Sequence, residues 1–122
     1  MAYLHDDVFD DGLNVLTNDA DELHILSQEP ASYANVATYT LGNKAGPTVS
    51  APADRSGGGR EVTVSAITDG DVTGTDDATH WALIDTVGSR LLATNSLSAG
   101  QAVTDNNVFT LAQFKIGIPD PA

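Results

Sequence analysis

Most of the chain alternates between apolar and polar positions in short runs, a pattern that predicts β-strands. From residue 19 onward, segments rich in Val, Thr and Ile are separated by Gly, Pro, Asn and Asp, the residues that favour turns. Val62 and Val64 fall on one face of such a run and Thr63 on the other, as in a sheet with one buried side. The expected strands cover residues 22–27, 37–41, 60–67, 80–86, 90–94, 107–111 and 114–118.

Two of these strands and the turn between them are predicted in more detail. Residues 81–84 are apolar at every position, so their strand is expected to be central and buried on both faces. Residues 86–89 are expected to form a hairpin loop, with Gly88 supplying a positive φ. This places the strands over residues 80–86 and 90–94 side by side.

The last two predicted strands change parity. Phe109 and Leu111 share one face, whereas Phe114 and Ile116 share the face of opposite parity. A bulge or break at residues 112–113 reconciles the two patterns.

The N-terminal segment has a helical pattern and a strongly negative charge. Apolar side chains recur at helical spacing over residues 6–17, and an aspartate at the start favours the positive end of the helix. The first 29 residues carry eight acids and no Lys or Arg. Gly12 costs a helix about 1 kcal/mol relative to Ala, which leaves open an extended arm that orders on docking. Residues 1–18 are therefore expected to form an acidic helix or arm.

The remaining chain, residues 19–122, is expected to be a single β domain. Long surface loops are predicted over residues 42–59, which hold two prolines and a triple glycine, and over residues 69–79. Short strands joined by such loops predict a mainly β fold: a small antiparallel β-sandwich or barrel with one short N-terminal helix or arm.

Composition restricts the partners that this domain can have. At 122 residues and 41% hydrophobic content, without Cys, the chain is long enough to bury a core without disulfides. Its 17 acids against 5 Lys and Arg give a net charge of −12, which opposes binding to nucleic acid and to anionic membranes. The apolar runs are too short for a membrane span or the core of a signal peptide, so we expect a protein of the cytosol, or one released by lysis.

Metal binding is not favoured by the sequence. Residues 69–77 begin like a calcium loop, but Thr73 and His80 stand where an EF-hand counted from the first residue needs acidic ligands. A solvated β-turn is therefore favoured over an occupied calcium site. His5 and His24 are remote in sequence from each other and from His80, without the spacing of a zinc site. We expect no metal and no other cofactor.

The sequence also contains no motif that predicts catalysis. It has no Cys and no Gly-x-Ser-x-Gly elbow, and its acids are too many for any pair to be informative, so we expect no enzyme. Trp81, Phe109 and Phe114 lie in strand patterns, where core packing is favoured over a sugar-binding platform.

A glycine-rich segment between two arginines invites two interpretations. Residues 55–60 lack the Gly-Lys-Ser/Thr ending of a phosphate-binding loop and precede a strand rather than a helix. The segment is then either a flexible loop tip, or a contact at which Arg55 and Arg60 bind acids of a neighbouring subunit.

The strand and turn residues together resemble one protein family. They include residues 78–85 (ATHWALID), 90–94 (RLLAT), 97–104 (LSAGQAVT) and 107–111 (NVFTL), and the resemblance continues in residues 39–44 and 51–60. Over nearly its whole length the chain resembles small β-rich structural proteins of tailed bacteriophages and prophages. In that family a T-H-W/V-A-L-x-D strand is followed by L-L-A-T/A and by an N/D-T-F-T-L strand.

The resemblance implies a structural protein of the virion and no reaction chemistry. The role it implies best is a capsid decoration, or cement, protein that binds the outside of the major capsid protein lattice and stabilises the head. It also implies assembly in the host cytoplasm and a homotrimer at threefold positions. A tail, connector or tail-tube component and a host-surface carbohydrate-binding module are the alternatives.

The residues that we expect to contact the partner lie in two segments. The first contributes apolar side chains from the N-terminus, and the second is the arginine and glycine segment. The predicted contact residues are Tyr3, Leu4, Val8, Phe9, Arg55, Gly57, Gly58, Gly59 and Arg60.

Overall fold

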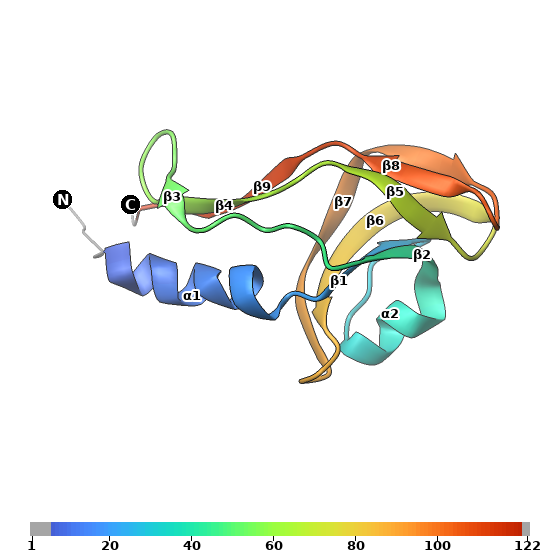
Figure 1. The fold of residues 1–122 in the computed structure, drawn as a ribbon, viewed down its shortest axis with the longest axis horizontal. Helices are drawn as coiled ribbons and strands as arrows, with labels where there is room; N and C mark the ends of the chain where they lie inside the picture. Colours follow the sequence, from blue (N-terminus) through green and yellow to red (C-terminus); the bar gives the residue numbers. More distant parts are fainter. Residues whose placement is uncertain (1–5, 121–122) are drawn as a thin grey trace.

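A curled antiparallel sheet of six strands, in the order β7-β6-β1-β2-β5-β8, forms the body of the protein (Figure 1). A second sheet, in the order β3-β4-β9, extends from it. The computed structural model describes residues 6–120. Its strands are β1 (Glu22–Leu26), β2 (Thr40–Ala45), β3 (Ala53–Asp54), β4 (Arg60–Val64), β5 (Ile67–Val72), β6 (Asp76–Asp85), β7 (Arg90–Val103), β8 (Val108–Leu111) and β9 (Phe114–Ile118). Its helices are α1 (Asp6–Asp19) and α2 (Tyr33–Tyr39).

This architecture confirms the predicted fold class, a small β-rich barrel or sandwich with an N-terminal helix. It also confirms the break between the last two strands. Residues 65–66 separate β4 from β5, and residues 112–113 separate β8 from β9, so one pair of chain segments runs through both sheets. We call the second sheet, formed by β3, β4 and β9, the ribbon.

The second helix was not predicted, and residues 37–39 of the expected strand belong to it. Ser32 caps the helix by accepting a hydrogen bond from the Asn35 backbone N–H. Val36 is buried against Leu26 and Ile84, so packing on the sheet holds a segment whose β-branched and aromatic residues favour a strand.

The loops predicted over residues 42–59 and 69–79 are shorter than expected. Residues 42–45 lie in β2, residues 69–72 in β5 and residues 76–79 in β6. The sequence Asp69-Gly70-Asp71 is turn-like, but pairing with β2 and β8 holds it in a strand, with both aspartates exposed and Gly70 buried. Strand pairing from two sides therefore outweighs the local turn preference.

Apolar side chains pack on both faces of the central strands. On the inner face, Leu13 and Leu16 of α1 join Leu23 and Ile25 of β1 in the main core. On the outer face, α2 covers a smaller cluster that includes Ala82 of β6. Residues 81–84 are all buried and β6 lies between β1 and β7, which confirms the prediction of a central strand.

Gly70 is required by packing, because it lies opposite Phe109 in the β5–β8 ladder. A Cβ at Gly70 would overlap the Phe109 ring, which is itself fully buried. We predict that Gly70→Ala lowers the free energy of unfolding by about 1–3 kcal/mol, the usual cost of overpacking a core. Urea unfolding followed by fluorescence measures this.

Gly100→Ala is the matched control, because a Cβ there makes only an ordinary contact with the Ala78 carbonyl oxygen at 3.5 Å. Equal stability of the two variants would contradict the packing argument.

Candidate functional site

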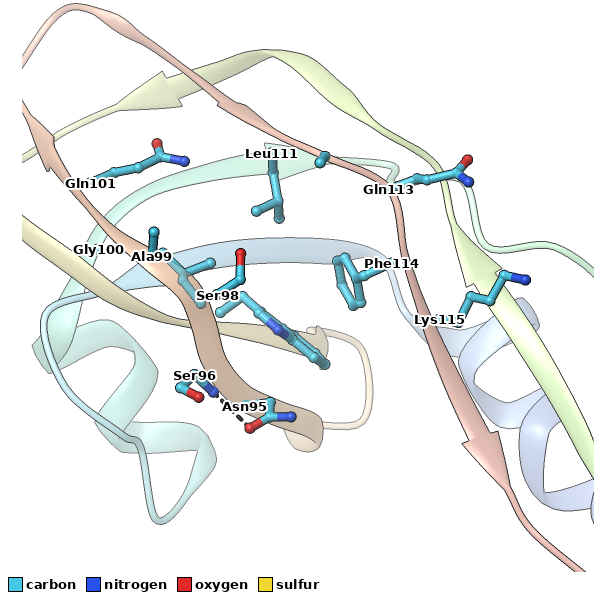
Figure 2. A pocket seen from close by; sticks show the side chains of 13 residues that line it. Asn95, Ser96, Ser98, Ala99, Gly100, Gln101, Leu111, Gln113, Phe114 and Lys115 are labelled. Atoms are coloured by element: carbon cyan, nitrogen blue, oxygen red, sulfur yellow. Dashed lines mark hydrogen bonds between the residues drawn. The ribbon is translucent and has the colours of Figure 1, made fainter. Parts of the chain in front are cut away.

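The six-stranded sheet curls without closing into a barrel, and this leaves an open seam between β7 and the β8–β9 segment. The two strands meet at the turn over residues 104–107, where Gln101 Nε2 donates a hydrogen bond to the Thr110 carbonyl oxygen at 3.1 Å. Beyond this contact they diverge and leave a groove of about 440 Å³ (Figure 2). We call it the seam groove.

The seam groove has an aromatic floor and mixed walls. Trp81 and Phe114 pack together at its floor, with ring centroids 4.4 Å apart and planes tilted by 37°. In Figure 2, Leu111 and Phe114 point from one wall toward β7, which carries Ser98 and Ala99 on the other. The described lining consists of Trp81, Asn95, Ser96, Leu97, Ser98, Ala99, Gly100, Gln101, Leu111, Ala112, Gln113, Phe114 and Lys115.

Of the three aromatic residues predicted to pack in the core, two are buried there and the third lies at its edge. Phe109 and Trp81 are buried, with exposures of 2% and 8%, which confirms the core prediction for both. Phe114 is half-buried and packs against the core from the groove side. The faces of both groove rings are therefore largely covered.

A large bulge in β7 forms one wall of the groove. Ala78 pairs with Gln101 and His80 pairs with Ser96, so Thr79 alone faces residues 97–100 of β7. Four residues against one interrupt the ladder between β7 and β6 at this point. Periodicity did not predict it, because residues 95–101 are mostly small and polar and show no alternation.

Arg60, expected to contact a neighbouring subunit, is bound within its own chain. Its Nε donates to Asp10 Oδ1 of α1 at 2.9 Å, and its Nη1 donates to Asp54 Oδ1 of β3 at 2.7 Å. Nη2 reaches the Pro52 carbonyl oxygen at 3.3 Å. One half-buried guanidinium thus ties the helix to the ribbon.

The glycines that precede Arg60 in the same predicted contact segment build a hydrogen-bonded turn at the tip of the ribbon. Gly57, Gly58 and Gly59 have φ values of +87°, +104° and +93°, which other residues rarely adopt. Arg55 closes the turn, since its N–H donates to the Gly59 carbonyl and its Nη1 donates to the Gly58 carbonyl, both at 3.0 Å. The sequence pattern found the turn but not the role of Arg55 within it.

The apolar part of the predicted contact set lies beyond what the structure describes. Tyr3 and Leu4 fall outside residues 6–120. Val8 and Phe9 belong to α1, but the positions of their side chains are outside the described part.

A second ion-pair cluster holds the other end of α1 against the β6–β7 hairpin. Asp85, only 7% exposed, accepts hydrogen bonds from the Val87 and Gly88 N–H groups at 3.0 Å and from Arg90 Nη2 at 2.8 Å. The same Arg90 nitrogen donates to Asp19 at the end of α1 at 3.0 Å. The Gly88 N–H and then the Arg90 guanidinium lower the pKa of Asp85 below its ordinary value.

The hairpin turn corrects one prediction. The positive φ, 54°, belongs to Ser89 and not to Gly88. Position 88 requires a glycine for a different reason, because a Cβ there would lie 2.6 Å from Asp85 Oδ2. Sequence alone did not reveal this, because the carboxylate reaches the turn only in the folded hairpin.

His24 lies in a polar arrangement that the sequence analysis missed. Its Nδ1 is 2.7 Å from Thr40 Oγ1, and its Nε2 is 2.8 Å from Glu22 Oε1. The Thr40 hydroxyl also donates to the Gly42 carbonyl at 3.1 Å. These contacts of Thr40 tie β1 to β2. A Glu-x-His pair on one strand face is the only signal that the sequence offers.

Other kinds of site are not seen in residues 6–120. No group of three or more His, Asp or Glu side chains there is arranged to hold a metal ion. In the segment 69–77, Asp69 instead pairs with Lys44 at 3.0 Å. No described helix is long and apolar enough to cross a membrane.

Comparison with known proteins gives no match to any family model, curated protein or solved structure. The resemblance to phage structural proteins therefore stays a prediction.

We predict that Arg60→Gln lowers the free energy of unfolding by about 1.5–3 kcal/mol, because charged hydrogen bonds to Asp10 are lost and the carboxylate stays against the ribbon. Amide hydrogen exchange should accelerate first in α1. Lys115→Gln is the control, since the Lys115–Glu61 pair has a largely exposed ammonium and is worth about 1 kcal/mol or less. Equal effects of the two changes would show that Arg60 does not anchor the helix.

Asp85 predicts a pH dependence of stability. Since folding lowers its pKa from the ordinary 3.8, the ionised carboxylate stabilises the fold above that value. This contribution disappears as the pH falls through the lowered folded pKa. Asp85→Asn should therefore be less stable than the wild type at pH 7, with a difference that narrows below about pH 4.

Urea unfolding at pH 7, 5 and 3 measures this difference. Asp105→Asn, a change in the exposed turn after β7, is the matched control. A constant difference between Asp85→Asn and the wild type from pH 7 to pH 3 would contradict the assignment.

Proposed function

We propose that the chain is a structural protein of a phage virion, and most specifically a capsid decoration protein. In this role it binds the outer surface of the major capsid protein lattice, as a homotrimer at threefold positions, and stabilises the head. The observation that carries the proposal is that four of the five basic side chains bind acids within the chain, whereas sheet edges are left open. Within residues 6–120, nothing pairs with the outer edges of β7 and β9.

The polar groups support a scaffold in preference to an enzyme. Arg60 and Arg90 tie α1 to the sheets, and His24 ties β1 to β2. Among the described residues, every buried side-chain nitrogen and oxygen has a hydrogen-bond partner. Because these bonds join separate elements of the fold, they give the polar groups that make them a structural role.

The charge distribution supports the outer surface of the head. Four of the five basic side chains bind acids of the same chain, which leaves the surplus of acids on the surface. Asp71, Asp76, Asp77 and Asp105 are all exposed at the end of the sheet that carries the turns after β5 and β7. Such a surface repels packaged DNA and suits contact with solvent.

The shape supports a contact with more than one subunit. The ribbon and α1 lie together at one end of the molecule, and the curled sheet lies at the other (Figure 1). A molecule of this form offers two separate surfaces, as a protein that spans the seam between neighbouring capsid subunits requires. The exposed Val108 lies in the sheet part.

Cryo-electron microscopy of the particle whose genome encodes the chain tests the proposal. We expect density for the six-stranded sheet at threefold or quasi-threefold positions on the head, and its loss from particles made without the gene. Heads without the protein should release DNA at a lower temperature. Density confined to the tail or portal would identify a tail or connector component instead, and absence from the particle would overturn a virion role.

A further inference from the structure

We infer that the seam groove binds an extended peptide segment as an added strand. On the function proposed above, on which this inference rests, the segment comes from the major capsid protein. Three features support this binding mode: the open strand edges at the two walls, the apolar floor and the charge of the lining.

The two walls belong to the two edges of the six-stranded sheet, and within residues 6–120 no strand pairs with β7 or β8 on the groove side. On β7, the register against β6 passes over residues 97–100. On the other wall, residues 112–113 lie between β8 and β9 and belong to neither ladder. Backbone N–H and C=O groups need partners, and an extended peptide supplies them at the spacing of a strand.

The floor provides places for alternate side chains of such a strand. Leu97 and Leu111 are half-buried on opposite walls, and Phe114 closes the floor above Trp81. Side chains of a bound strand that point inward would cover these apolar surfaces, and the next ones would point to solvent. The Gln101–Thr110 hydrogen bond closes one end of the groove. The peptide therefore enters from the end where β7 and β9 diverge.

The groove differs in charge from the rest of the molecule. In a chain with 17 acids, none of the 13 described residues that line the groove is acidic, and one, Lys115, is basic. An acidic peptide is repelled by most of this protein's surface, but the groove has no acid of its own to repel it. Charge thus favours an acidic segment at the groove, and the apolar floor favours apolar side chains at its alternate positions.

The arrangement of the rings favours a peptide over a carbohydrate. Sugars stack on an open aromatic face, but Trp81 is only 8% exposed and packs against Phe114. Covered rings provide an apolar floor, whereas the open edges of β7 and β8 are what an added strand pairs with.

The test is binding of the full-length protein to purified heads that lack it. Ala99→Glu places an acid on the exposed wall of the groove, where it opposes an incoming acidic strand. Val87→Glu, at a side chain 93% exposed on the β6–β7 hairpin, adds the same charge outside the groove. We expect Ala99→Glu to weaken binding at least tenfold and Val87→Glu to leave it unchanged.

Ala112→Glu repeats the test from the opposite wall, should Ala99→Glu lower the melting temperature. A photo-reactive benzoylphenylalanine at position 99 should crosslink to one segment of the capsid protein. A synthetic peptide of that segment should shift the emission of Trp81, the only tryptophan in the chain.

Each outcome decides between the two proposals. If the wild type binds heads and both groove variants bind equally well, the groove inference is overturned and the decoration function stands. If the wild type does not bind, the decoration function is overturned, and the inference falls with it. A shift of Trp81 emission by dextran or another neutral oligosaccharide, but not by the peptide, would overturn the peptide assignment in favour of a carbohydrate site.

Discussion

The structure depends on the docking of an acidic helix against a sheet that does not close. Leu13 and Leu16 of α1 complete the main core on the inner face of the sheet, but α1 carries five aspartates and no basic residue. Arg60 binds Asp10, and Arg90 binds Asp19 at the C-terminal end, where the helix dipole disfavours a negative charge. The two arginines thus offset the repulsion between the aspartates of α1 and the other acids of the chain. This repulsion would otherwise oppose the packing of Leu13 and Leu16 against the sheet.

The same ties explain how a chain with so few cations folds and remains strongly acidic outside. Arg60 and Arg90 each bind two carboxylates, so each cation reduces repulsion between two acids and also joins two elements. The pKa of Asp85 is lowered, because the N–H groups of the hairpin and Arg90 all stabilise its negative charge. The acids without a cation partner are left for the surface, and this surplus is the property on which the proposed outward-facing role rests.

Sequence patterns predicted those parts of the fold that depend on local periodicity. Three such predictions each depend on a single segment of sequence, and the structure agrees with all of them. They are the alternation around Val62, the apolar run at residues 81–84 and the parity change at residues 112–113. The helix α2 and the β5 strand were missed, because packing and pairing with distant segments override their local preferences. The partner of Arg60 lies 50 residues away, and no periodicity reveals such a pair.

The seam groove was unpredictable for the same reason, and its origin links the fold to the function proposed for it. A closed barrel would need β7 to pair with β8 along its length. The bulge at residues 97–100 prevents this on one side, and the departure of β9 into the ribbon prevents it on the other. In the described part of the chain, Gln101 spans the two edges through its side chain, where no strand ladder joins them. The features that keep the sheet open therefore also leave its two edges to a partner strand, so that binding at the groove would complete the sheet rather than distort it.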